Sequence, residues 1–244
     1  MANRPQSILG ALLFSLGLLL GIVLASVAVW GDLEAALFDT SSAQGERLAS
    51  LSCPVLITRG ETGRVSATFS NPGPVPEERA VRIRVSARHV TLMREESVRT
   101  PLAPGAAQRL SWPIDARDAA FGGLLILARV SALRQSAFLP AQTGSCGILV
   151  VDLPLVSGNA VVIGWLLLSL AGMIGGGWLW LAGHARRTWQ TRRAVYLMAA
   201  LGIVVLLAIV VGLLGMWALG VLVLALILLL LVAVLAQMIL QDSI

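Results

Sequence analysis

The chain contains one uncharged run from residue 194 to residue 240, AVYLMAALGIVVLLAIVVGLLGMWALGVLVLALILLLLVAVLAQMIL. A helix needs roughly 20 apolar residues to cross the hydrocarbon core of a bilayer. The run is more than twice as long, so two spans joined by a tight turn fit it better than one helix. We predict a transmembrane hairpin with helices at about 195–214 and 217–239. The residues that mark its turn are Gly212, Gly215 and Trp217.

Two further apolar runs lie earlier in the chain, at 8–30 and at about 160–182. The first could be a cleaved signal peptide, because Ser26-Val27-Ala28 resembles a small-residue cleavage site. Its apolar length of about 22 residues nevertheless exceeds the usual 7–15 of a signal peptide, which favours an uncleaved signal anchor. With the hairpin, the sequence predicts four transmembrane helices.

Arginine placement predicts the orientation of these helices. Cytoplasmic loops are rich in basic residues, and Trp is enriched at both membrane interfaces. The basic residues that flank the spans are Arg4, Arg186, Arg187, Arg192 and Arg193. We therefore expect a multi-pass protein of the plasma (inner) membrane with both termini in the cytoplasm and residues 31–157 outside it. The expected interface aromatics are Trp30, Trp165 and Trp217 on the outer side and Trp178 and Trp180 on the inner side.

The composition favours the membrane class and argues against nucleic-acid binding. Hydrophobic residues make up 57% of the chain and charged residues 13%. The formal net charge is +5, but residues 31–157 are close to neutral, so the surplus lies beside the apolar runs. Basic residues beside apolar runs orient helices in a membrane, whereas a nucleic-acid-binding protein would cluster them on one surface.

Between the first two spans the sequence alternates in the manner of β-strands. Apolar and polar residues alternate over 65–70 and 81–88, and the run 124–133 is more continuously apolar, as expected of a central strand. Turn residues separate these runs at 71–74 and 122–123. The pattern predicts an antiparallel β-sandwich over residues 53–153.

Part of this domain resembles the CARDB-type immunoglobulin-like modules. The resemblance is carried by RGETGRVSATFSNPG at 59–73, then by LAPG at 102–105 and RLSW at 109–112. It implies an immunoglobulin-like sandwich and covers about 100 residues, but none of the helices. Such modules serve as spacers, adhesive units or binding platforms, so the resemblance implies no single function.

Cys53 and Cys146 are the two cysteines of the chain, and they bracket the predicted sandwich. Outside the cytoplasm a disulfide between them would persist, and closing so long a loop would contribute up to roughly 4–5 kcal/mol. Two free buried thiols are the alternative. Two cysteines at this spacing cannot form a CxxC redox pair or a cysteine zinc site.

Small residues recur every fourth position in the first two spans, at Gly17, Gly21 and Ala25 and at Gly172 and Gly176. This spacing lets membrane helices approach closely, so the two spans are expected to pack on each other. A seam for another subunit and a simple effect of Gly-rich composition remain open. Before the sandwich, we expect Asp32 to cap a short amphipathic turn at the membrane surface.

The expected order of segments can therefore be written out in full. It is an N-terminal tail and first helix at 1–30, a linker at 31–52, the sandwich at 53–153, a second helix at 158–183, a basic cytoplasmic loop at 184–193, the helical hairpin at 194–240 and a cytoplasmic tail at 241–244.

No residue pattern points to catalysis, a metal or a cofactor. His89 lies beside no nucleophile motif, and we interpret it as a solvated histidine at a strand edge. His184 has no second ligand in the spans and is interpreted as an interfacial anchor. The spans carry no ionisable side chain, which argues against transport. We expect no enzyme activity.

Three functions remain as hypotheses. The first is a non-catalytic accessory or assembly subunit whose sandwich and helices bind partner proteins, other membrane subunits or a second copy. The second is an envelope receptor that binds a glycan or peptide through the sandwich. Arg82, Arg84 and Arg88 form a basic face that could meet an anionic ligand, but we favour the interpretation of a solvated strand face balanced by nearby Glu. We do not expect a small-molecule ligand. The third is a permease subunit with the topology of FtsX-like and MacB-like proteins, which work with a cytoplasmic ATPase.

Overall fold

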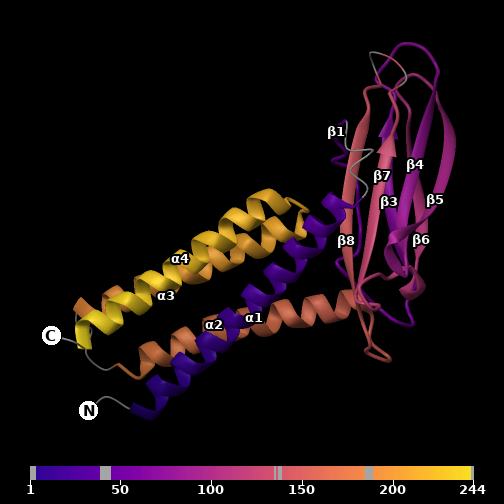
Figure 1. Cartoon of the computed structure of the whole chain (residues 1–244). Coiled ribbons are helices and arrows are strands. Elements are labelled where there is room, and N and C mark those ends of the chain that lie inside the picture. Colours follow the sequence, from indigo (N-terminus) through magenta and orange to yellow (C-terminus); the bar gives the residue numbers. More distant parts are fainter. Residues whose placement is uncertain (1–3, 39–44, 135, 137–138, 185–188, 243–244) are drawn as a thin grey trace. The chain divides into compact units, whose positions relative to one another are not determined.

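The computed structural model of the chain describes residues 4–38, 45–134, 136, 139–184 and 189–242 (Figure 1). The chain divides into two compact units. The helical unit comprises Met1–Val29 and Ile163–Ile244, and the β unit comprises Trp30–Val162. The β unit therefore contains the last turns of the first helix and the first turn of the second.

The helices of the described chain are α1 (Arg4–Leu37), α2 (Gly158–Ala182), α3 (Trp189–Leu213) and α4 (Trp217–Asp242). By length and composition three of them can cross a membrane, over Pro5–Leu37, Gly158–Ala182 and Thr191–Leu213. In α4 the described apolar segment is shorter than in the other three helices and covers Trp217–Val232.

The first helix is longer than the sequence predicts. We expected it to end near residue 30 and a linker with a separate short turn to begin at residue 31. Instead α1 continues without a break to Leu37. Residues 33–37 are Leu-Glu-Ala-Ala-Leu, all good helix formers, and the buried Ala35 packs against the β unit. Propensity and packing together carry the helix past the apolar run.

The helical hairpin has its turn close to the expected place. Gly215 adopts a left-handed φ of 66° between α3 and α4, and its N–H donates to the carbonyl oxygen of Gly212, in the last turn of α3, at 3.0 Å. Arg192 and Arg193 lie inside the first turns of α3, so the basic loop is shorter than predicted. Arg186 and Arg187 lie outside the described residues, and Arg4 is the first residue of α1.

The described residues of the β unit form eight strands in two sheets. They are β1 (Glu46–Arg47), β2 (Leu56–Thr58), β3 (Gly63–Ser70), β4 (Glu77–Ala87), β5 (His89–Leu102), β6 (Ala107–Ile114), β7 (Leu125–Ala132) and β8 (Gln142–Val151). The larger sheet has the order β1-β8-β7-β4-β5, with β2 also paired to β8. The smaller sheet pairs β3 with β6.

The larger sheet is mixed, whereas the sequence predicts a wholly antiparallel fold. The pairs β4–β5, β4–β7 and β7–β8 are antiparallel, but β1 and β2 both pair with β8 in parallel. Such short edge segments carry too few residues for a pattern to predict their partner. Between them Ser52 makes an isolated bridge to Ser66 of the other sheet. The segment that precedes β2 therefore contacts both sheets.

One apolar core joins the two sheets. The smaller sheet contributes Val65, Phe69 and Trp112, and the larger sheet contributes Ile83 and Ile148, all of them almost fully buried. These positions follow the period-2 alternation of their strands, so the alternating faces predicted from the sequence do form the interior.

Candidate functional site

The end of α1 is held on the outer face of the larger sheet. Gly31 and Gly147 meet so closely that a Cβ on Gly147 would lie about 2 Å from the carbonyl oxygen of Gly31. The backbone N–H of Gly147 donates a hydrogen bond of 3.2 Å to Asp32 Oδ1. Asp32 is only 8% exposed, so it does not cap a separate turn as we expected. It anchors a continuous helix to β8.

Arg129 of β7 closes the last turn of this helix. Its Nη1 donates to the carbonyl oxygens of Ala36 at 3.3 Å and Phe38 at 2.8 Å. The last four carbonyls of a helix have no partner within the helix, and their partial negative charge favours a cation there. Arg129 is 6% exposed, so these are buried, charge-assisted bonds. No sequence pattern links Arg129 to this helix.

The start of α2 is held by Glu61, which lies between β2 and β3. Glu61 Oε2 accepts from the backbone N–H of Gly158 at 2.7 Å and of Thr58 at 3.2 Å. An acidic group at a helix N-terminus satisfies unpaired N–H groups and complements the helix dipole. Gly158 also packs directly on the backbone of Leu56, where a Cβ would collide with the carbonyl oxygen.

The disulfide lies next to the first of these attachments. Cys53 and Cys146 are bonded, with their Cα atoms 6.5 Å apart and 93 positions apart in the sequence. Cys146 directly precedes Gly147, the residue against which α1 packs. The disulfide therefore links the segment before β2 to β8, the strand against which α1 packs.

Five residues attach the end of α1 and the start of α2 to the sheets of the β unit. We call this set the helix mount: Gly31, Asp32, Glu61, Arg129 and Gly147.

Two arginines of β4 share one carboxylate within the sheet. One carboxylate, that of Glu95 on β5, pairs with Arg82 Nε at 3.1 Å and with Arg84 Nε at 2.8 Å. Arg88 lies in the turn after β4, at a φ of 64°, and is exposed. The Glu95 pairs agree with the favoured interpretation of a strand face balanced by nearby Glu, whereas Arg88 lies in a turn.

Among the described residues, β5 forms one edge of the larger sheet and pairs with β4 alone along the strand order. It spans 14 residues, and its first nine, His89–Ser97, are exposed. His89 begins this strand, as the sequence interpretation of a solvated edge histidine requires. An exposed strand edge offers unpaired N–H and C=O groups to another chain.

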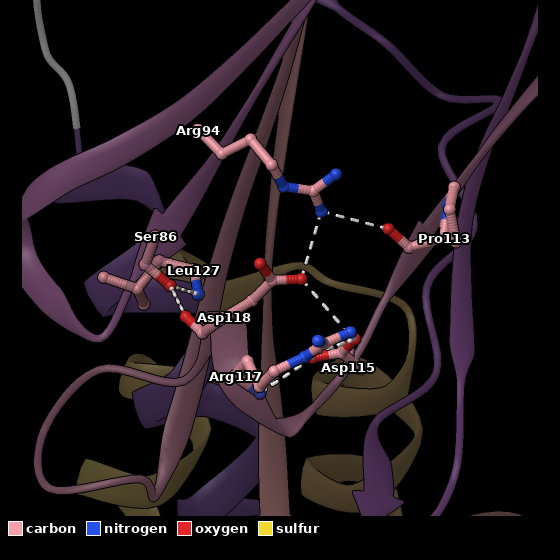
Figure 2. A network of polar contacts seen from close by, with 7 residues as sticks. All are labelled: Ser86, Arg94, Pro113, Asp115, Arg117, Asp118 and Leu127. Carbon is pink, nitrogen blue, oxygen red and sulfur yellow. Dashed lines mark hydrogen bonds and ion pairs between the residues drawn. The ribbon is translucent and has the colours of Figure 1, made fainter.

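A polar network connects this edge strand to the rest of the β unit (Figure 2). Arg94 Nη2 on β5 donates to Asp118 Oδ2 at 3.0 Å and to the carbonyl oxygen of Pro113 on β6 at 3.1 Å. The hydroxyl of Ser86 donates to the carbonyl of Asp118 and accepts from the N–H of Leu127. The network joins four strands, and it gives β5 a fixed position.

The same network contains no catalytic pairing. The Arg117 guanidinium, 2.7 Å from Asp115 Oδ2, holds the pKa of that carboxyl below its usual range. Asp115 also accepts from the backbone of Arg117 as the cap of a short 3-10 turn, Ala116–Asp118. Among the described residues, no group of three or more His, Cys, Asp and Glu side chains could hold a metal ion.

In the helical unit, the predicted small-residue positions lie at two different contacts. Gly17 packs against the backbone of Gly172 and Met173, and Gly176 packs against Phe14. Gly21 and Ala25 instead contact α3. The Cβ position of Gly21 lies 2.7 Å from the Val205 side chain, and the carbonyl oxygen of Ala25 lies 3.6 Å from the Cβ position of Gly212. One stripe on α1 therefore serves two neighbours, α2 and α3. Gly10 and Gly183, which the spacing analysis omitted, extend the α1–α2 contact.

Side-chain hydrogen bonds reinforce this contact between α1 and α2. Ser169 Oγ donates to the carbonyl oxygen of Gly17 at 2.8 Å, and Trp165 Nε1 donates to that of Leu20 at 3.0 Å. Trp165 is thus an interhelical donor, whereas the sequence suggested an interface anchor. Trp178 is 68% exposed, Trp30 39% and Trp217 37%. Trp180 stacks on His184, whose Nδ1 contacts the Trp180 carbonyl.

The helical unit also contains an apolar cavity of about 440 Å³ between α1, α2 and α3. Phe14, Met173, Trp178, Met198 and Gly202 are among its lining residues. Functional pockets usually combine an apolar lining with a few convergent polar groups. The lining here is almost entirely apolar, so the cavity offers packing space and no acid–base or nucleophilic group.

Comparisons with known proteins add no family. No family model and no curated protein matches the chain. Among solved structures it is similar to a Paenibacillus sp. cycloisomaltooligosaccharide glucanotransferase complexed with cycloisomaltoheptaose, at 13% identity and a TM-score of 0.32. The match covers 44% of this chain and only 14% of that enzyme. A likeness this weak carries no argument about activity.

Proposed function

We propose that the protein is a non-catalytic accessory or assembly subunit of a membrane complex, whose β unit binds a partner protein. The observation that carries the proposal is the free edge of β5, 14 residues long and exposed over its first nine. Added strands obtain main-chain hydrogen bonds from such an edge. The Arg94 network supports the same role because it keeps the edge in place for a partner.

The proposal places the β unit outside the cytoplasm, in an immunoglobulin-like fold. The order β8-β7-β4-β5 opposite β3-β6 resembles the G-F-C-C′ and B-E strand sets of that fold. The disulfide is consistent with an oxidising compartment. The four helices would cross the plasma membrane with both termini in the cytoplasm, as Arg4 and the basic residues before α3 suggest.

The receptor and permease alternatives receive less support. A receptor for an anionic ligand needs exposed cations, but Arg82 and Arg84 share the Glu95 carboxylate. No described contact favours coupling to an ATPase.

A photo-crosslinking experiment tests the proposal. A photoreactive amino acid replaces Glu96 on the exposed part of β5, and a control replaces Gln108, an exposed residue of β6 on the other sheet. We expect irradiated cells to yield, after mild-detergent extraction, a specific adduct at Glu96 and a weaker one or none at Gln108. Equal labelling at both sites, or recovery of an uncrosslinked monomer from several detergents, would contradict it.

A further inference from the structure

Two apolar residues of the β unit, Phe121 and Leu155, adopt a left-handed backbone with φ of 50° and 72°. Bulky side chains rarely adopt this conformation because it is strained. Burial of the side chain often offsets such strain. Here Leu155 is fully exposed, so burial within the chain does not offset its strain, and Phe121, which is 38% exposed, is covered only in part.

Both residues lie in short loops that expose further apolar side chains. Phe121 belongs to the turn before β7, which is closed by the Ala120 N–H bonded to the Leu125 carbonyl and which also exposes Leu124 at 54%. Leu155 lies in the connection to α2, between the exposed Leu153 and Val156. We call 121–124 and 153–156 the base loops.

The base loops adjoin the points where the apolar helices enter the β unit. The Phe121 ring lies 6.1 Å from the ring of Trp30, at the end of the apolar run of α1. Val156 precedes the first residue of α2, Gly158, by two positions. The exposed apolar surface of the loops therefore continues the apolar surface of both helices.

A charged pair lies beside the loops. Arg59 Nη1 contacts Asp152 Oδ2 at 3.3 Å, with both side chains more than half exposed. Arg59 also reaches to 4.0 Å from the Cβ position of Gly123 in the first loop. Aromatic and apolar side chains next to arginine are typical of the membrane–water interface, where the charge stays among the headgroups.

We propose that the base loops insert into the lipid at the membrane surface, with Phe121, Leu124 and Leu155 among the acyl chains and Arg59 among the headgroups. The inference rests on the proposed function only in that α1 and α2 cross a bilayer. Lipid surrounds the ends of membrane helices, and it accepts scattered apolar side chains without a matched protein surface. The strained backbone at Phe121 and Leu155 directs those side chains outward into it.

Single-cysteine labelling tests whether the base loops lie in lipid. Both native cysteines are in the disulfide, so an introduced cysteine provides the only free thiol for the label. The full chain is placed in phosphatidylcholine–phosphatidylglycerol nanodiscs after labelling with an environment-sensitive fluorophore. The test variants are Phe121→Cys, Leu124→Cys and Leu155→Cys. All three side chains are exposed, so the label replaces no core packing, and a melting temperature equal to that of the parent checks each fold.

Two matched controls separate the possible outcomes. Leu133 is 50% exposed like Leu124 but follows β7, whereas Leu124 precedes it, so the two lie at opposite ends of one strand. Leu19 is 56% exposed in the apolar run of α1 and reports membrane insertion itself. The variants are Leu133→Cys and Leu19→Cys.

We expect labels at the base loops to emit at shorter wavelength than the Leu133 label. A spin-labelled lipid should quench them several-fold more strongly than it quenches Leu133, and aqueous iodide should do the reverse. Base labels that behave like Leu133 while Leu19 stays in lipid would overturn the inference and leave the membrane function standing. A Leu19 label in water would overturn the membrane function. Base labels shielded from both quenchers would indicate protein contact and also overturn the inference.

Discussion

At the scale of single residues, the structure assigns the largest role to Arg129. It lies on the second-last strand of the β unit, yet its guanidinium closes a helix that ends about 90 positions earlier. Its bond to Phe38 is buried and its bond to Ala36 is partly buried. Carbonyl groups left unpaired in such a site cost about 1–3 kcal/mol each.

Replacing Arg129 with methionine should therefore destabilise the β unit by roughly 2–4 kcal/mol, because the apolar volume is kept while the bonds to the α1 carbonyls are lost. The melting temperature of the full chain in detergent measures this change. Arg99→Met, at an exposed position near the end of β5, is the matched control and should melt within about 1–2 °C of the parent. Equal melting temperatures for the two variants would show that Arg129 does not support α1.

At the scale of elements, the contact between α1 and α2 depends on backbone approach. A Cβ on Gly176 would lie 2.3 Å from the backbone nitrogen of Phe14, whereas a Cβ on the adjacent Gly175 meets nothing within 4 Å. Two neighbouring glycines of one helix therefore have opposite surroundings. The difference follows from the 3.6-residue period, which turns successive positions by about 100°.

Gly176→Leu should force α1 and α2 apart, because backbone atoms cannot move aside as a flexible side chain would. Gly175→Leu should be tolerated, because a side chain there points into open space. We expect the first variant to lose at least 5–10 °C of thermal stability in detergent or to aggregate on size exclusion, at a cost of about 2–4 kcal/mol. If Gly175→Leu lowers the melting temperature as much as Gly176→Leu, the described contact between α1 and α2 is wrong.

At the scale of the whole molecule, the strands β1 to β8 lie between α1 and α2 in the chain. The mount residues and the Cys53–Cys146 disulfide hold both connections within the β unit. These contacts fix the end of α1 and the start of α2 on the sheets of the β unit itself.

Replacing both cysteines by serine should remove roughly 4–5 kcal/mol of stability, since the disulfide closes a loop of 93 residues. Thermal unfolding of the full chain with and without a reductant measures this contribution. The parent should lose stability on reduction, and the Cys53→Ser, Cys146→Ser variant should show no further loss. A reductant effect of equal size in both proteins would place the sensitivity elsewhere.

Much of this architecture follows from the sequence by itself. The lengths of the apolar runs predict the helices, the alternation at 65–70 and 81–88 predicts two strands, and Gly215 marks the hairpin turn. These signals are local, because hydrophobic period and turn chemistry act over a few residues. The bonding of Cys53 to Cys146 was also anticipated, since the chain offers no other partner.

The remaining features depend on tertiary structure because they join residues that are far apart in the sequence. Only the folded chain brings Arg129 to the end of α1, Glu61 to the start of α2 and Glu95 between two arginines. Only the strand register decides that β5 forms an edge, and only helix packing divides the small-residue stripe of α1 between two neighbours. The apolar runs were thus determined by the sequence alone, while the mount that connects them to the β unit arises from long-range contacts that no local pattern encodes.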